Sequence, residues 1–175
     1  MVRRVRAVLD AIYFAGGVLA ALCLIAILVL IVVQMVARWT GEVFAGAPDY
    51  AGYAMAAASF LAFAHALNRG AHIRVSLLLN SVPPRARRYV EIWCFAIGTA
   101  LGWYFVYYAA RFVFWSWKFK DISQGTDATP LWIPQMAMLV GAFIFALALT
   151  DHLVALFTDG KHRMRDNLVD QSHGE

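Results

Sequence analysis

Three histidines carry the side chains best suited to chemistry in a sequence that is otherwise mostly apolar. His65 and His152 lie in or next to two separate apolar stretches, and imidazoles from two helices can hold one haem iron as axial ligands. His72 follows His65 by seven residues, so a continuous helix would place both on one side. The alternative is that these imidazoles bond to backbone, water or lipid near a membrane surface. A haem-linked or quinone-linked membrane subunit is therefore one hypothesis, although a bundle with two haems would need further histidines in its opposite half.

Four uncharged stretches must position these residues. They are Ala11–Ala37, Tyr50–Asn68, Ile92–Ala110 and Ala128–Thr150. An α-helix rises about 1.5 Å per residue, so roughly 20 apolar residues span a hydrocarbon core of about 30 Å. Hydrophobic residues make up 62% of the sequence and charged residues 15%, a balance that indicates lipid as the solvent. The sequence therefore predicts an all-α integral membrane protein with four transmembrane helices, the first of which is long enough to tilt or to protrude.

Lysine and arginine are concentrated on alternate sides of these helices. Of the 15, 11 lie before the first stretch, between the second and third stretches, and in the C-terminal tail. Such an excess marks the cytoplasmic side of a membrane protein. We therefore expect a cytoplasmic N-terminus (residues 1–10), a transmembrane domain (residues 11–157) and a cytoplasmic tail (residues 158–175), with no nucleic-acid partner.

The four stretches lack the groups that a pump or an exchanger needs. Such proteins use ionisable residues or broken helices near mid-membrane, and no Asp, Glu, Lys or Arg lies inside any stretch. No nucleophile, base and orienting group fall close together on this topology, and Cys23 and Cys94 lack metal-ligand spacing. We therefore expect an accessory subunit that is not an enzyme, holds no metal or cofactor, and cannot move a charged solute by itself.

Side-chain size predicts how the helices pack. The second stretch is rich in alanine, and small side chains let membrane helices approach closely, so we expect this helix in the middle of the bundle. Gly98 and Gly102 give the third stretch a G-x-x-x-G spacing, which predicts a second close contact. The outer end of the third stretch is aromatic, which fits an interfacial belt, a surface for another membrane protein, or both.

The connection between the second and third stretches has the pattern of a segment that lies along the cytoplasmic interface. Residues 69–79 are apolar with interspersed arginines, and Pro84 suits the first turn of the next helix. Arg85, Arg87 and Arg88 follow, where they are placed for contacts with lipid phosphates.

The last helix has proline on both sides of its expected start. Thr129 is the expected N-cap, and Pro130 the expected first helical residue. Pro134 lies about one turn further on, where we expect it to bend or loosen the start of the helix.

Three short motifs occur in an order that is similar to one family. Asp49 opens the second stretch, residues 68–75 (Asn-Arg-Gly-Ala-His-Ile-Arg-Val) are similar to the pattern R-x-G-x-H-I-x-V, and residues 130–134 (Pro-Leu-Trp-Ile-Pro) contain P-x-W-I-P. Over residues 11–157 the chain resembles the small membrane subunit of tripartite ATP-independent periplasmic (TRAP) transporters, the DctQ-type family. The resemblance rests on these motif residues: His72, Arg74, Pro130, Trp132 and Pro134.

The resemblance implies a scaffold role in the bacterial inner membrane. In that family a soluble periplasmic protein captures an organic acid, and a large multi-span subunit holds the substrate and sodium sites and moves the substrate. The small subunit packs beside the large one. The implied partners are therefore the large subunit, the periplasmic binding protein and membrane lipids, and sodium is expected in the large subunit.

Charged residues in the outer connections could form part of the docking surface for the binding protein. Charges of both signs on an otherwise apolar subunit motivate this hypothesis, and ordinary solvated loops are the alternative. The residues are Glu42, Asp49, Lys118, Lys120, Asp121 and Asp127.

Two further expectations concern the cytoplasmic side and the competing functions. His72 and Arg74 are expected to fix the turn at the cytoplasmic face, and Arg74 could also bind a lipid phosphate. Besides a haem-linked or quinone-linked subunit, a free-standing membrane assembly protein remains an alternative to the scaffold role.

Overall fold

Four long helices make up the part of the protein that is described. The computed structural model describes residues 2–42, 44–69 and 84–158. Each helix contains a segment long and apolar enough to cross a membrane, and no strand occurs in these three ranges. This confirms the all-helical fold with four candidate transmembrane helices. The helices are α1 (Val2–Trp39), α2 (Ala47–Asn68), α4 (Pro84–Phe119) and α5 (Trp132–Thr158).

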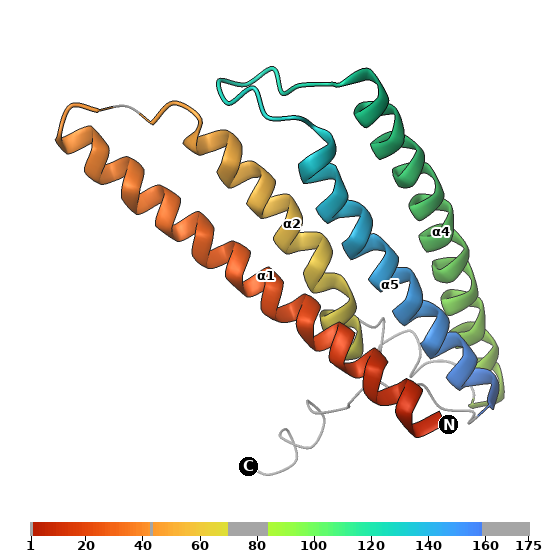
Figure 1. Cartoon of the computed structure of the whole chain (residues 1–175). Helices are drawn as coiled ribbons and strands as arrows, with labels where there is room; N and C mark the ends of the chain where they lie inside the picture. Colours follow the sequence, from red (N-terminus) through yellow and green to blue (C-terminus); the bar gives the residue numbers. More distant parts are fainter. Residues whose placement is uncertain (1, 43, 70–83, 159–175) are drawn as a thin grey trace, which may run out of the picture.

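The helices lie side by side in the order α1, α2, α5, α4 (Figure 1). α2 packs against α1 and α5, α5 packs also against α4, and α1 makes only minor contacts with α5. The prediction that the alanine-rich helix lies in the middle is confirmed, since α2 and α5 form the inner pair. α1 begins and α5 ends at one end of the bundle, called the terminal end here, and the α1–α2 and α4–α5 connections lie at the opposite, loop end.

Small residues bring α2 and α5 together. A Cβ added at Gly141 of α5 would come within 2.5 Å of the carbonyl carbon of Phe60 on α2, so only glycine fits there. Ala64 of α2 and Ala148 of α5 are fully buried in a cluster that also holds Tyr13 of α1. Close approach of the backbones lets many weak van der Waals contacts hold the helices together in a solvent as apolar as the side chains.

The G-x-x-x-G pair of α4 faces α5, as its spacing predicted. Cβ atoms added at Gly98 and Gly102 would meet Leu149 and Ala146 at 3.5 Å or more, which is ordinary van der Waals contact. The pair therefore lies in a helix–helix contact, but alanine would fit in both positions, unlike at Gly141.

α4 is longer than its sequence pattern predicted. It continues past Ala110 to Phe119, because no glycine or proline interrupts the aromatic segment. Lys118, which was expected in an outer connection, therefore lies in the last turn of the helix, and Arg111 lies on the helix as well.

The predicted start of the last helix is wrong by two residues. α5 begins at Trp132, whereas Pro130 forms an isolated antiparallel bridge with Ile122. Ser123 N donates to Thr129 O at 2.8 Å, and these pairings hold Thr129 and Pro130 in the loop, out of the helix. Pro134 lies in the first turn of α5, where a missing N–H costs no helical hydrogen bond.

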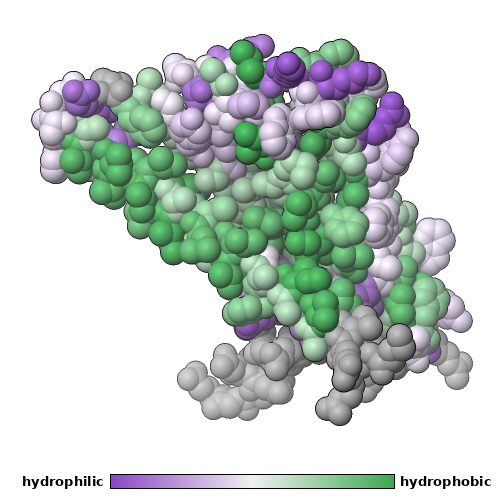
Figure 2. Space-filling model, in the orientation of Figure 1, coloured by the Kyte–Doolittle hydropathy of each residue, from purple (hydrophilic) through white to green (hydrophobic). Residues whose placement is uncertain are grey.

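The surface has the polarity expected of a bundle in a bilayer. A hydrophobic band separates hydrophilic residues at the loop end from those at the terminal end (Figure 2). Large apolar side chains along α1 and aromatic side chains along α4, among them Tyr104 and Trp117, are exposed. Both outer helices therefore present apolar faces that lipid or another membrane protein can cover.

Candidate functional site

At the loop end, the α4–α5 loop (residues 120–131) is tied to the start of α2. The backbone N–H and the hydroxyl of Thr126 donate to Asp49 Oδ2 at 3.2 and 3.3 Å. The Tyr53 hydroxyl donates to Ser123 Oγ at 2.8 Å. Asp49 lies in the first turn of α2, where the helix dipole favours a carboxylate. The first two turns of α2 therefore position the loop through one carboxylate and one phenol.

Gly125 makes the contact with Asp49 possible. A Cβ added at Gly125 would lie 2.5 Å from Asp49 Oδ2, well inside van der Waals contact. The loop can therefore lie directly against the carboxylate only because this position has no side chain. The sequence motifs did not reveal this role.

Asp127 belongs to the same region and lies near several hydroxyl groups. Its carboxylate oxygens are buried, and its Cβ lies against Gly46, just before α2. The Thr129 hydroxyl stabilises the ionised form and lowers the pKa of Asp127, the Ser123 and Tyr53 hydroxyls act in the same direction, and desolvation opposes them. Asp127 is therefore an ionised, internal residue of the loop at neutral pH.

The structure divides the six predicted docking residues into two groups. Asp49 and Asp127 are engaged within the loop region. The other four, Glu42, Lys118, Lys120 and Asp121, are exposed. Docking stays a prediction for all six residues.

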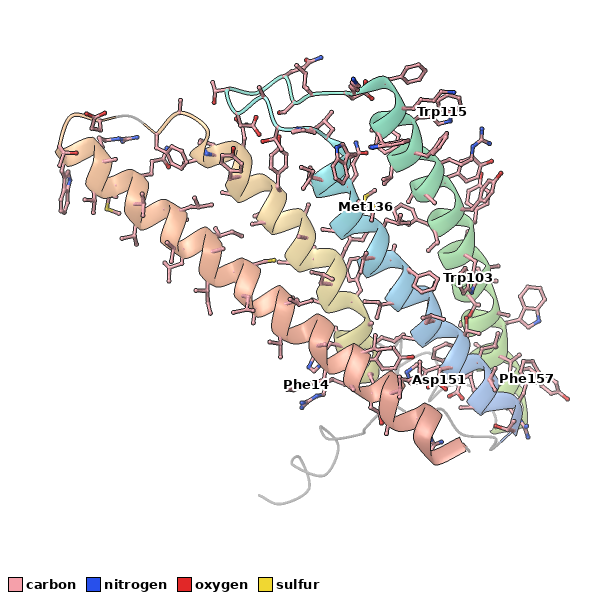
Figure 3. All side chains as sticks on the ribbon, in the orientation of Figure 1. Phe14, Trp103, Trp115, Met136, Asp151 and Phe157 are labelled. Atoms are coloured by element: carbon pink, nitrogen blue, oxygen red, sulfur yellow. The ribbon has the colours of Figure 1, made fainter. Side chains whose placement is uncertain are left out.

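The exposed lysines border a groove of about 540 Å³ between the end of α4 and the start of α5. Lys118 Nζ lies 4.9 Å above the Trp115 ring, a distance at which a cation–π interaction holds the ammonium group. Figure 3 places Trp115 at the loop end of α4. The groove brings two motif residues next to the lysines, which the sequence alone did not reveal. Its lining residues are Trp117, Lys118, Lys120, Ile122, Pro130 and Trp132.

At the terminal end, the predicted arginine cluster is only partly described. Arg85 and Arg87 belong to the first turns of α4, and Arg88 Nη2 donates to the Leu156 carbonyl at 3.5 Å near the end of α5. A cation near these last carbonyls is favoured by the helix dipole. His72, Arg74 and the predicted interfacial segment lie outside the described residues. Lipid contacts of the arginines stay a prediction.

The two candidate haem ligands pack against different outer helices. The His65 ring lies against α1, where it is centred 6.3 Å from Phe14 and would meet a Cβ at Gly17 at 2.8 Å. His152 is buried on α5 with its ring 5.8 Å from Phe95 of α4. Within the described ranges no group of three or more potential metal ligands occurs. Both imidazoles therefore pack against neighbouring helices, and haem ligation by them stays an untested hypothesis.

A polar cleft of about 530 Å³ opens between α1, α2 and α5 at the terminal end. Two arginines, two aspartates and one imidazole line it, and Phe14 forms an apolar wall. Sequence analysis missed this site because the residues come from the ends of three helices. The charged and aromatic lining residues are Arg6, Asp10, Phe14, His65, Arg69 and Asp151.

The fold and these sites define a helical membrane protein with four candidate membrane-spanning helices. The chain belongs to the family of the DctQ component of tripartite ATP-independent periplasmic transporters, whose family model matches residues 27–159. It is therefore the small membrane subunit of a TRAP transporter, a component of a transport system and not of an enzyme family. The resemblance seen in the sequence motifs is confirmed. A comparison with curated proteins finds no match.

Proposed function

We propose that this chain is the fixed scaffold subunit of a secondary-active, sodium-coupled transporter that imports an organic acid. A periplasmic binding protein delivers the acid, and a larger multi-span subunit holds the substrate and sodium sites. This chain packs beside that subunit in the bacterial inner membrane. Membership of the DctQ family is the observation that carries the proposal.

The distribution of charge supports a scaffold over a carrier. α2 carries no Asp, Glu, Lys or Arg after Asp49, and α1 carries none between Asp10 and Arg38. A helix that binds and moves a charged solute needs polar groups or a break near mid-membrane. α1 and α2 are continuous helices, from Val2 to Trp39 and from Ala47 to Asn68. Substrate and sodium binding therefore belong to the partner in this proposal.

The proposed orientation places the terminal end in the cytoplasm and the loop end in the periplasm. The excess of Lys and Arg near the start of α1, from the end of α2 to the first turns of α4, and after α5 supports it. The α4–α5 loop then faces the binding protein, and its exposed charges are available for docking. Fixing the loop to α2 through Asp49 and Tyr53 gives this surface a defined shape.

Reconstitution into proteoliposomes tests the scaffold role. The large subunit is reconstituted with and without this chain, and sodium-driven uptake of the labelled organic acid is measured with the binding protein present. We expect uptake only with both subunits, whereas sodium and substrate binding persist on the large subunit alone. Saturable sodium or substrate binding by this chain alone would overturn the proposal.

A further inference from the structure

We propose that the polar cleft at the terminal end binds the headgroup of a phospholipid that carries a phosphate and a primary ammonium group, as phosphatidylethanolamine does. The cleft is lined by charges of both signs, with Arg6 and Arg69 opposite in charge to Asp10 and Asp151. It lies between three helices at one end of the bundle, and Figure 3 shows Phe14 and Asp151 there. This goes beyond the scaffold function, because it assigns a ligand to a site that transport does not explain.

A row of residues along α1 has the polarity of a phospholipid. Residues four apart are neighbours on a ridge that winds around the helix, and the ridge Arg6, Asp10, Phe14, Val18, Leu22 changes along its length from charged to aromatic to aliphatic. Phe14, Val18 and Leu22 are 59%, 43% and 54% exposed, so the apolar part of the row is open to a ligand. A headgroup in the cleft would therefore have its acyl chains directed along an apolar track into the hydrophobic band.

The charges in the cleft favour a zwitterionic headgroup over an anionic one. Guanidinium groups bind phosphate through several N–H donors, and a primary ammonium group has three donors for carboxylates. Two aspartates would repel a headgroup that carries only negative charge. A quaternary ammonium group has no N–H to donate, so phosphatidylcholine fits less well than phosphatidylethanolamine.

His65 gives the cleft its fixed wall. Its ring lies against Gly17, where a Cβ would come within 2.8 Å of it, and beside Phe14. The absence of a side chain at Gly17 lets the ring stay between α1 and α2. The packing of α1 against α2 therefore holds His65 and Phe14 in place on one side of the cleft.

Native mass spectrometry of the full chain with defined lipids tests the proposal. The purified protein is titrated with phosphatidylethanolamine, phosphatidylcholine and phosphatidylglycerol of the same acyl composition. We expect one saturable phosphatidylethanolamine, bound at least severalfold more tightly than either other lipid. Equal binding of all three lipids would overturn the proposal.

Two exposed residues of α1 give variants that leave the helix packing intact. We expect Asp10→Asn to weaken phosphatidylethanolamine binding by about tenfold, because the ammonium group loses a charged hydrogen bond to the carboxylate. The difference in affinity between phosphatidylethanolamine and phosphatidylglycerol should therefore become smaller. Arg6→Gln should weaken binding of all three lipids, because all of them carry phosphate. Glu42→Gln, an exposed carboxylate at the loop end, is the matched control and should bind as the wild type does. Unchanged binding in both α1 variants would contradict the site.

Competition with glycerophosphoethanolamine separates the membrane lipid from a soluble ligand with the same headgroup chemistry. Because the acyl chains should follow Phe14, Val18 and Leu22, we expect the soluble headgroup to displace the lipid only at concentrations about a hundredfold higher. Displacement at equal concentration would overturn the lipid assignment.

A double variant, Arg6→Asp with Asp10→Arg, keeps the net charge of the cleft but exchanges the positions of the two charges. It should therefore bind the three lipids without preference, and a retained preference for phosphatidylethanolamine would contradict the site.

Discussion

At Gly125 and Asp49, one missing side chain decides how a loop is held. The carboxylate accepts two hydrogen bonds from Thr126, and a Cβ at Gly125 would lie 2.5 Å from Oδ2. We expect Gly125→Ala to raise the rate of trypsin cleavage after Lys120 by roughly fivefold in detergent-purified protein, because losing about 1 kcal/mol of hydrogen bonding opens the loop more often.

Gly52→Ala is the matched control for this experiment. A Cβ at Gly52 meets nothing within 4 Å, so this variant should be cleaved at the wild-type rate. Equal cleavage rates in the two variants would show that the contact with Asp49 does not hold the loop.

The pKa of Asp127 predicts how pH acts on the same loop. The Thr129 hydroxyl and its neighbours lower this pKa below the ordinary 3.8, so folding favours the ionised form. This stabilisation is fully present above the unfolded-state value and is lost as the pH falls through the lower folded-state value. We expect Asp127→Asn to lower Tm equally at about pH 5 and about pH 7, and the difference from wild type to shrink below about pH 3.5. A difference that grows toward acid pH would contradict this account.

At the residue scale, the sequence predicted where a residue lies in its helix better than it predicted the residue's hydrogen-bond partners. Asp49 was expected at the start of the second helix, and it lies in the first turn of α2. Its partner Thr126 is 77 positions away, and only the packing of α2 beside α5 brings the two together. No local pattern encodes such a hydrogen bond, and the terminal cleft was missed for the same reason.

At the scale of helices, Gly141 allows α2 and α5 to approach closely. A Cβ there would come within 2.5 Å of the Phe60 carbonyl carbon, so the two backbones must separate. We expect Gly141→Ala to destabilise the bundle by roughly 1–3 kcal/mol, as overpacking does in other close-packed interiors. Thermal unfolding in detergent measures the change.

Gly98→Ala provides the comparison for Gly141→Ala. The added Cβ meets the Leu149 side chain at 3.7 Å, an ordinary contact, and alanine also favours the helix. This variant should be as stable as the wild type or more stable. A larger loss of stability at position 98 than at position 141 would contradict the packing described here.

The sequence predicted the presence of the four helices better than it predicted the residues at which they begin and end. Hydrophobicity and length were sufficient to predict four spans, since each described helix contains a candidate transmembrane segment. The α5 start was misplaced because Thr129 and Pro130 have good cap chemistry but are held by pairing with Ser123 and Ile122. Long-range pairing of this kind outweighs a local capping preference.

At the scale of the whole molecule, the loop end should mediate contact with the binding protein. Lys118 and Lys120 are exposed there beside a groove. We expect Lys118→Glu with Lys120→Glu to raise the binding-protein concentration needed for half-maximal uptake by roughly tenfold, with little change in uptake at saturation. The effect should weaken as salt screens the charges.

Arginine at both positions keeps the charge and is the control. Lys118→Arg with Lys120→Arg should support uptake with the wild-type dependence on binding protein. If charge reversal also leaves that dependence unchanged, docking does not involve these lysines.

Purification of the tagged full chain in a gentle detergent tests the central claim most directly. The scaffold function predicts that a large multi-span membrane subunit co-purifies in stoichiometric amount, because a small-residue core and long helical segments without charged residues leave the transport chemistry to a partner. Mass spectrometry identifies the partner, and an absorption spectrum detects bound haem. A solitary chain, above all one with a haem absorption band, would contradict the account and return attention to His65 and His152.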